Sequence, residues 1–256
     1  RDAKRGAKIG AVLVTVNTSY KIFEAEYLLR QSDAKVLVMM DGFKDTSYFQ
    51  IIHELNPALK DSKPGELENP MLPFLKHVVY TGARECPGMY RWRDIEAMGA
   101  GIPDAVLREI EADLSPDEII NMQYTSGTTG FPKGVMLTHS NIVNNGKCIG
   151  DRMRFTDADK LCVCVPFFHC FGLVLGIMAC LTHGSSMVPV DAYSPLKVMK
   201  AVQDEQCTAL HGVPTMFIAI LEHPEFPNYR FPKLRTGIMA GSPCPIKVMQ
   251  QVVDVM

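Results

Sequence analysis

The chain has 256 residues, and 47% of them are hydrophobic, so it can bury a substantial core as one large domain or as two small ones. The 26 lysines and arginines nearly balance the 28 aspartates and glutamates, which gives a formal net charge of −2. This balance gives no electrostatic indication of nucleic acid or an anionic membrane as the main partner, and we expect no nucleic-acid partner.

Short β-prone runs alternate with stretches of helical periodicity along the chain. In chain order, the expected strands are Ile9–Val16, Lys35–Met40, His77–Thr81, Ile119–Tyr124, Leu161–Val165, Ser186–Val190, Thr208–His211 and Thr236–Ala240. The expected helices are Ile22–Gln31, Ser47–Leu55, Ser140–Met153, Gly172–Leu181, Pro195–Glu205, Pro214–Glu222 and Pro245–Met256. Such alternation is typical of βαβ units, so the sequence predicts an α/β fold with mainly parallel sheets flanked by helices.

Two connections lack this periodicity. The composition of Asn56–Pro73, rich in Pro, Lys, Glu and Asn, predicts an exposed excursion, and Gly99–Asp117 is expected to be irregular or partly helical. We place a boundary between a first α/β subdomain, residues 1–116, and a second, residues 117–256. An apolar strand follows the first residues directly, and helical spacing continues to Met256, so we expect the first subdomain to be incomplete at its start and the second at its end.

The eight cysteines are scattered along the chain and form no C-x-x-C pair. Cys162 and Cys164 are spaced to share one face of a strand, and Cys170 adjoins His169, so a zinc site is conceivable. Small buried thiols in a reducing compartment explain the pattern better. No signal peptide is visible, and we expect a cytoplasmic protein.

One uncharged stretch, Leu161–Thr182, imitates a membrane span. Pro166 and His169 interrupt it, and its second part, Gly172–Leu181, is too short, because a membrane-spanning helix needs about 20 residues. A buried strand, a loop and a buried helix explain the stretch better, so we expect no transmembrane segment.

A polar loop lies between the apolar runs Ile119–Tyr124 and Val135–Leu137. Its glycines let the backbone approach a ligand, its hydroxyls donate hydrogen bonds, and its lysine supplies a compact positive charge. A solvated hairpin turn can share this composition, but the width of the loop favours polyphosphate binding. It is not a P-loop, because Lys133 is followed by Gly134 and a strand. The candidate phosphate-binding residues are Thr125, Ser126, Gly127, Thr128, Thr129, Gly130 and Lys133.

Two further turns lie where a strand is expected to end and a helix to begin. Ligands of open α/β sheets collect at the carboxyl ends of strands. In the first turn, Pro166–Gly172, His169 could donate to a phosphate or carboxylate, although a histidine satisfied in the core or capping the helix is an equally good interpretation. In the second, Gly241, Ser242 and Pro243 could bring backbone close to a flat base or an acyl group, or form a simple strand–helix turn.

The stretch Thr125–Gly134 resembles the AMP-binding signature of the adenylate-forming superfamily at every fixed position. That superfamily includes acyl-CoA synthetases, adenylation domains of nonribosomal peptide synthetases and beetle luciferases. Pro166–Gly172 resembles its second motif, an aromatic–His run beside the acyl and AMP sites. The turn Gly241–Pro243 is similar to the small-residue turn that borders the adenine and the acyl pocket, although Pro243 replaces the commoner small residue. With His211–Phe217, these segments look most like the medium-chain fatty acyl-CoA synthetase branch.

The resemblance implies a partial N-terminal domain of the acyl-CoA synthetase-like fold and a two-step reaction. A carboxylate, expected to be a medium-chain fatty acid, attacks the α-phosphorus of Mg-ATP to give an acyl-adenylate and pyrophosphate, and coenzyme A then displaces AMP. The resemblance further implies that Lys133 and the loop hydroxyls stabilise phosphate charge, that Thr128 faces Mg²⁺, and that His169 lies near the attacking carboxylate. Lys133 and His169 are therefore the candidate catalytic residues.

Other motifs of the family do not occur in the chain. They are a Tyr-Gly-x-Thr-Glu motif whose Glu helps hold Mg²⁺, a ribose-binding Asp, an Arg, and the Lys of a mobile C-terminal domain. We therefore expect the chain alone to be inactive, although its parent is a ligase. Two alternatives stay open: an amino-acid-activating adenylation domain, and a non-catalytic nucleotide-binding module. The lack of an acidic residue in Phe167–Gly172 and Gly241–Pro245 favours a fatty acid over an amino acid.

Overall fold

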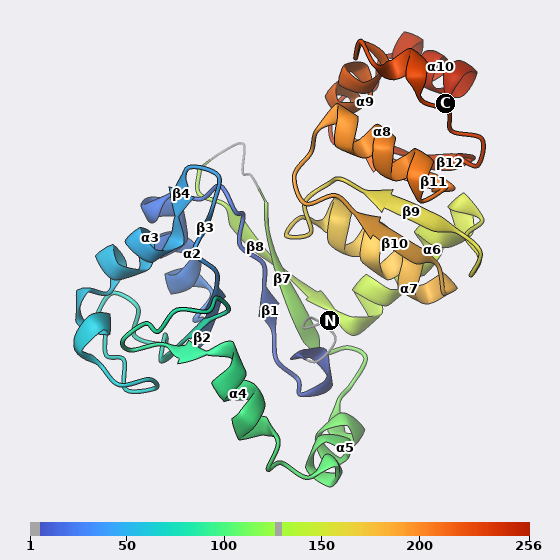
Figure 1. Ribbon diagram of the computed structural model, residues 1–256. Helices are drawn as coiled ribbons and strands as arrows, with labels where there is room; N and C mark the ends of the chain where they lie inside the picture. Colours follow the sequence, from blue (N-terminus) through green and yellow to red (C-terminus); the bar gives the residue numbers. More distant parts are fainter. Residues whose placement is uncertain (1–5, 126–129) are drawn as a thin grey trace. The chain divides into compact units, whose positions relative to one another are not determined.

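The computed structural model describes residues 6–125 and 130–256 (Figure 1). Contacts divide the chain into two compact units, Arg1–His139 and Ser140–Met256. The division falls after the hairpin that carries the polar loop, because this hairpin pairs with a strand of the first unit. The subdomain boundary expected between residues 116 and 117 concerns a larger fold and stays a prediction.

Small sheets make up the framework of the first unit. β5 pairs in parallel with β2 and β6, β7 pairs in parallel with β1 and antiparallel with β8, and β3 and β4 form a short antiparallel pair. The strands are β1 (Leu13–Val14), β2 (Val36–Met39), β3 (Gly42–Phe43), β4 (Thr46–Ser47), β5 (His77–Tyr80), β6 (Tyr90–Arg91), β7 (Ile119–Thr125) and β8 (Lys133–Thr138). The helices are α2 (Ile22–Gln31), α3 (Tyr48–Leu55), the 3₁₀-helix η1 (Pro57–Asp61), α4 (Trp92–Gly99) and α5 (Asp104–Asp113).

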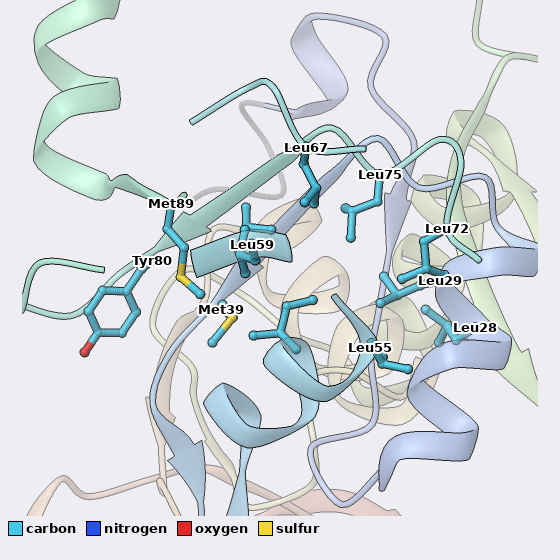
Figure 2. Close-up of a cluster of buried hydrophobic side chains, with 12 residues drawn as sticks. Leu28, Leu29, Met39, Leu55, Leu59, Leu67, Leu72, Leu75, Tyr80 and Met89 are labelled. Atoms are coloured by element: carbon cyan, nitrogen blue, oxygen red, sulfur yellow. The ribbon is translucent and has the colours of Figure 1, made fainter. Parts of the chain in front are cut away.

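The core of the first unit forms between α2, α3 and β5 (Figure 2). Leu28 and Leu29 of α2 are part of this core, so the face of the helix that carries them is buried. The expected excursion at Asn56–Pro73 is exposed at most of its residues, but its leucines enter the same core. Leu59 is 0% exposed, and Leu67 and Leu72 are each 1% exposed. Burial of such side chains contributes about 1.5–3 kcal/mol each, which outweighs the polar composition around them.

The second unit contains a four-stranded parallel sheet in the order β10-β9-β11-β12. Its strands are β9 (Lys160–Val163), β10 (Ser186–Pro189), β11 (Ala209–Gly212) and β12 (Thr236–Met239). The helices are α6 (His139–Met153), the π-helix η2 (Phe171–Met178), α7 (Ala179–His183), α8 (Pro195–Asp204), α9 (Pro214–Leu221), the 3₁₀-helix η3 (Phe226–Asn228) and α10 (Ile246–Val255). The predicted mainly parallel α/β fold is therefore confirmed.

The uncharged stretch Leu161–Thr182 folds as the sequence predicts. It forms the buried strand β9, a turn, and the consecutive helices η2 and α7. Central strands of a parallel sheet are covered on both faces, which accounts for a continuous apolar run in β9. Within the described ranges, no helix combines the length and the apolar character needed to cross a membrane.

All eight cysteines are free, and only some match the expected small buried thiols. Cys162, Cys164, Cys180 and Cys207 are buried in the second unit, where they fill space beside the strands. In contrast, Cys148 and Cys170 are exposed, and Cys86 and Cys244 are half-buried. Among residues 6–125 and 130–256, no three side chains of His, Cys, Asp or Glu gather in a way that could hold a metal ion.

A buried carboxylate ties together the amino ends of three strands of the second sheet. The Arg235 guanidinium donates to both oxygens of Asp159, at 3.1 Å from Nε and 2.6 Å from Nη2. Thr208 donates its hydroxyl at 2.6 Å, and the backbone N–H of Thr156 donates at 2.8 Å. Burial alone would raise the pKa of Asp159, but the hydrogen bonds outweigh burial and lower the pKa to about 2. We call Asp159, Thr208 and Arg235 the strand clamp.

Candidate functional site

The candidate phosphate loop connects the two strands of an antiparallel hairpin. β7 ends at Thr125 and β8 begins at Lys133, and these two residues are register partners across the hairpin. Both side chains are exposed, and Lys133 forms no ion pair with any residue that the structure describes. The predicted contacts of Ser126, Gly127, Thr128 and Thr129 lie outside the described residues.

Gly130 begins the described part of the loop on the β8 side. Its φ of +141° is a backbone conformation that L-residues rarely adopt, and no atom of the described residues lies within 4 Å of the position where a β-carbon would be. Glycine is therefore required here by backbone geometry and not by crowding. A glycine at positive φ and an exposed ammonium three residues later suit a large anion such as a polyphosphate.

Helix α2 holds the β8 side of the loop through one tyrosine. The Tyr27 ring stacks on Phe131, with 4.9 Å between ring centroids and 21° between planes. The Tyr27 hydroxyl donates to the carbonyl oxygen of Pro132 at 3.0 Å. Both residues that precede Lys133 therefore contact Tyr27. No local sequence pattern predicts this contact, because Tyr27 and Pro132 are 105 residues apart.

His169 lies in the turn that follows β9, and it caps the helix that comes after it. Its Nδ1 accepts a hydrogen bond from the Phe171 backbone N–H at 3.1 Å. An accepting Nδ1 carries no proton, so in the neutral ring the proton is on Nε2. The side chain is exposed, and Nε2 has no hydrogen-bond partner among the described residues. The two interpretations of His169 are therefore compatible: one nitrogen caps the helix while the other is free to donate to a ligand.

The turn Gly241–Pro243 follows β12 at the same edge of the sheet. Gly241 has φ of +93°, and a β-carbon there would lie 3.0 Å from Cγ1 of Val213, the residue after β11. The Ala240 N–H donates to the carbonyl oxygen of Gly212 at 3.2 Å, which keeps the turn against the end of β11. Gly241, Ser242 and Pro243 are all exposed, so backbone and one hydroxyl are open to a ligand.

The two turns of the second unit thus share one edge of its sheet. β9, β11 and β12 are parallel neighbours, so their carboxyl ends point the same way. The His169 turn follows the first of these strands, and the Gly241 turn follows the third. This is the edge at which ligands of open α/β sheets bind.

A buried histidine supports the helix that starts beside His169. His211 of β11 is 0% exposed, and its Nε2 lies 3.1 Å from the carbonyl oxygen of Leu175 in the π-helix η2. Its ring lies against Phe171 at 5.6 Å between centroids. Burial lowers the pKa of His211, while its hydrogen bond to Leu175 opposes the change. His211 is therefore neutral, and its Nε2–H donates to the Leu175 carbonyl oxygen of η2. The sequence did not predict this role.

The donor set fits phosphate and carboxylate groups. An exposed ammonium and a hydroxyl face the loop in the first unit, and an imidazole N–H and open backbone lie at the sheet edge of the second. For Mg²⁺, the candidate residue Thr128 lies outside the described residues. Each unit therefore presents its own donors that suit a nucleotide: Lys133 in the first, and the two turns in the second.

Comparisons with known proteins agree with these features. A family model described as AMP-binding enzyme matches residues 6–256. YngI of Bacillus subtilis (strain 168), named as an acyl-CoA synthetase, is 54% identical over 248 residues, which are 97% of this chain and 45% of YngI. The mitochondrial medium-chain acyl-CoA ligase ACSF2 of Mus musculus is 37% identical over 256 residues, which are 98% of this chain and 42% of that protein. The chain thus spans less than half the length of these relatives.

Solved structures confirm the fold. The inhibitor-bound N-terminal domain of FACL13 from Mycobacterium tuberculosis matches 98% of this chain and 56% of its own, with a TM-score of 0.72 and 20% identity. The apo structure of MbtA from Mycobacterium smegmatis matches 100% of this chain and 42% of its own, with a TM-score of 0.78 and 21% identity. The expected partial N-terminal domain of an adenylate-forming fold is therefore present.

Proposed function

The chain belongs to the AMP-binding enzyme family, and we propose on that basis that it is part of an ATP-dependent fatty acid–CoA ligase. The observation that carries the proposal is the hairpin in which exposed Thr125 is the register partner of exposed Lys133, at the two ends of a glycine-bearing loop. Relatives named as acyl-CoA synthetase and acyl-CoA ligase cover almost all of the chain. The proposed products are an acyl-adenylate with pyrophosphate, and then an acyl-CoA thioester.

In the first step a carboxylate oxygen attacks the α-phosphorus of ATP, and the bond to the departing pyrophosphate breaks. Negative charge builds up on the leaving phosphates, and the ammonium of Lys133 with the hydroxyl of Thr125 is suited to stabilise it. His169, with Nδ1 held by the Phe171 N–H, can donate from Nε2 to the carboxylate or phosphate. Bound Mg²⁺ would neutralise further phosphate charge, with Thr128 as its proposed contact.

In the second step the thiol of coenzyme A displaces AMP from the acyl-adenylate. The exposed turn Gly241–Pro243 is suited to border the adenine and the acyl group, because φ at Gly241 turns its backbone without a side chain in the way. We propose a medium-chain acid, since the chain is similar to ligases named for that substrate. We propose the cytoplasm as the compartment from the free thiols, although the name of the mouse relative places that protein in mitochondria.

Pyrophosphate release from ATP tests the proposal. The full-length protein that contains this chain is assayed with straight-chain acids of increasing length and with a set of amino acids. We expect turnover with medium-chain acids, no turnover with amino acids, and none from the 256-residue chain alone. Turnover with amino acids would favour the adenylation-domain alternative, and an inactive full-length protein that still binds ATP would favour the non-catalytic module. Turnover by the chain alone at the rate of the full-length protein would refute its predicted inactivity.

A further inference from the structure

We infer that Tyr27 of α2 is a positioning residue for Lys133, and that α2 is the platform on which the phosphate-loop hairpin is set. The expected effect on catalysis rests on the proposed function, whereas the contacts between Tyr27 and the hairpin do not. It is based on contacts that α2 makes with both strands of the hairpin, on either side of the loop.

On the β8 side, two consecutive residues are fixed by one side chain. Phe131 is 75% exposed, so burial does not hold its ring, and its stacking on Tyr27 does. Pro132 has no N–H and a restricted φ, and its carbonyl accepts from the Tyr27 hydroxyl at 3.0 Å. The peptide bond that leads into Lys133 is thereby oriented, and the start of β8 is held.

On the β7 side, Tyr124 precedes Thr125 and packs against the core that contains Leu28 and Leu29 of α2. Burial raises the pKa of Tyr124, the nearby Tyr27 phenol adds to this rise, and Ser32 at the end of α2 opposes it. Neither the Tyr124 hydroxyl nor the Ser32 hydroxyl completes a hydrogen bond of good geometry with a described residue. The β7 side is therefore held by packing, and the directional bond to the loop comes from Tyr27.

Tyr27 would affect catalysis indirectly, by fixing the position of the Lys133 ammonium. Enzymes lose activity when a charged group is displaced by about 1 Å, even by a change far from the chemistry. Removal of the Tyr27 hydroxyl should therefore lower kcat/KM for ATP while leaving the fatty-acid KM unchanged. Loss of one hydrogen bond of this kind corresponds to a change on the order of 3- to 10-fold.

The test uses the full-length protein and ATP–pyrophosphate exchange with a fatty acid. Tyr27→Phe removes the bond and keeps the ring, Phe131→Ala removes the stacking, and the double variant measures their coupling. Tyr90→Phe is the matched control, because the Tyr90 hydroxyl donates to the carbonyl of Pro64 at 3.1 Å, away from the hairpin. We expect kcat/KM for ATP to fall about 3- to 10-fold in Tyr27→Phe, further in Tyr27→Leu, and not at all in Tyr90→Phe.

Hydrogen exchange of the segment 130–134 gives a readout that does not depend on activity. Tyr27→Phe and Phe131→Ala should speed exchange there relative to β5, and Tyr90→Phe should not. If the wild-type protein is inactive, the proposed function fails, and the exchange data alone show whether Tyr27 of α2 holds the hairpin in place. If wild type is active and the Tyr27 and Phe131 variants match it in both readouts, the inference is overturned. Should Tyr27 variants fail to fold, Phe131→Ala decides, since its ring is exposed.

Discussion

Replacement of Asp159 by Asn should destabilise the second unit without touching the candidate site. The carboxylate accepts two bonds from Arg235, one from the Thr208 hydroxyl and two from Thr156, through its N–H and its hydroxyl. An amide at this position keeps the shape but loses the charge, and its NH₂ group would face the guanidinium. The side chain of Asp159 is 5% exposed and that of Arg235 is 41% exposed, so only the carboxylate is removed from solvent.

The magnitude follows from the pKa of Asp159. Despite burial, the hydrogen bonds lower the pKa from its ordinary value of 3.8 to about 2. At about 1.36 kcal/mol per pH unit, this difference corresponds to roughly 2 to 3 kcal/mol of folding free energy near neutral pH. Because the folded-state pKa is the lower one, the unfolded chain binds more protons between about pH 4 and about pH 2. The contribution is therefore complete above about pH 5 and is lost as the pH falls through this range.

Urea unfolding of the full-length protein, with hydrogen exchange of β9 to locate the change, measures this effect. Asp159→Asn should lower the free energy of unfolding of the second unit by roughly 2 to 3 kcal/mol near neutral pH, and the difference should shrink toward about pH 2. Asp191→Asn is the control, because Asp191 pairs with Lys197 on the surface and its side chain is 81% exposed. An equal response of the two variants, or a difference that does not change with pH, would refute the reasoning.

Three further predictions concern the candidate site. Lys133→Ala should lower kcat/KM for ATP on the order of 100-fold, with partial recovery in Lys133→Arg, as measured by pyrophosphate release. Gly241→Ala should destabilise the second unit by about 1–3 kcal/mol in urea because φ is +93° and Val213 is close, whereas Gly99→Ala should not, since its β-carbon meets nothing within 4 Å. Burial lowers the pKa of His211, so its contribution to stability should decrease below about pH 6.5 as the unfolded chain takes up the proton, and His211→Leu should abolish this dependence in urea unfolding.

The sequence predicted those elements whose side chains repeat along the chain. α8 has a clear apolar face, so its position followed from periodicity, whereas β9 and β11 followed from short β-prone apolar runs between helical stretches. The hairpin of β3 and β4 has two residues in each strand, which is too short to show a period. Helix α4 carries Trp92, Ile95 and Met98 at helical spacing but has no buried residue, so tertiary packing does not reinforce this short pattern.

Parts of the site that depend on distant contacts could not be predicted. Lys133 was identified from its neighbours in the chain, because a phosphate loop is a local pattern. The role of Tyr27 depends on a bond between residues 105 positions apart. Likewise His211 meets the Leu175 carbonyl 36 residues away, and only the fold brings them together. A local motif therefore identifies residues that could contact a ligand, whereas the residues that hold them in place are brought there by tertiary packing.

In the second sheet, the strand clamp and the candidate ligand-binding turns lie at opposite ends of the strands. Asp159 precedes β9, Thr208 precedes β11, and Arg235 immediately precedes β12, so the strand clamp joins the amino ends of three parallel strands. The His169 and Gly241 turns follow the carboxyl ends of two of the same strands.

Because the strand clamp stabilises the opposite end of the sheet, the His169 and Gly241 turns are not needed for that purpose. They can therefore carry an imidazole N–H open to a ligand and a glycine at positive φ, both of which would lower the stability of a turn that held strands together. Loss of the clamp should therefore change unfolding and not the KM for ATP, while changes in the turns should alter the KM. A clamp variant that shifts the KM at a temperature where it stays folded would show that the two ends are coupled.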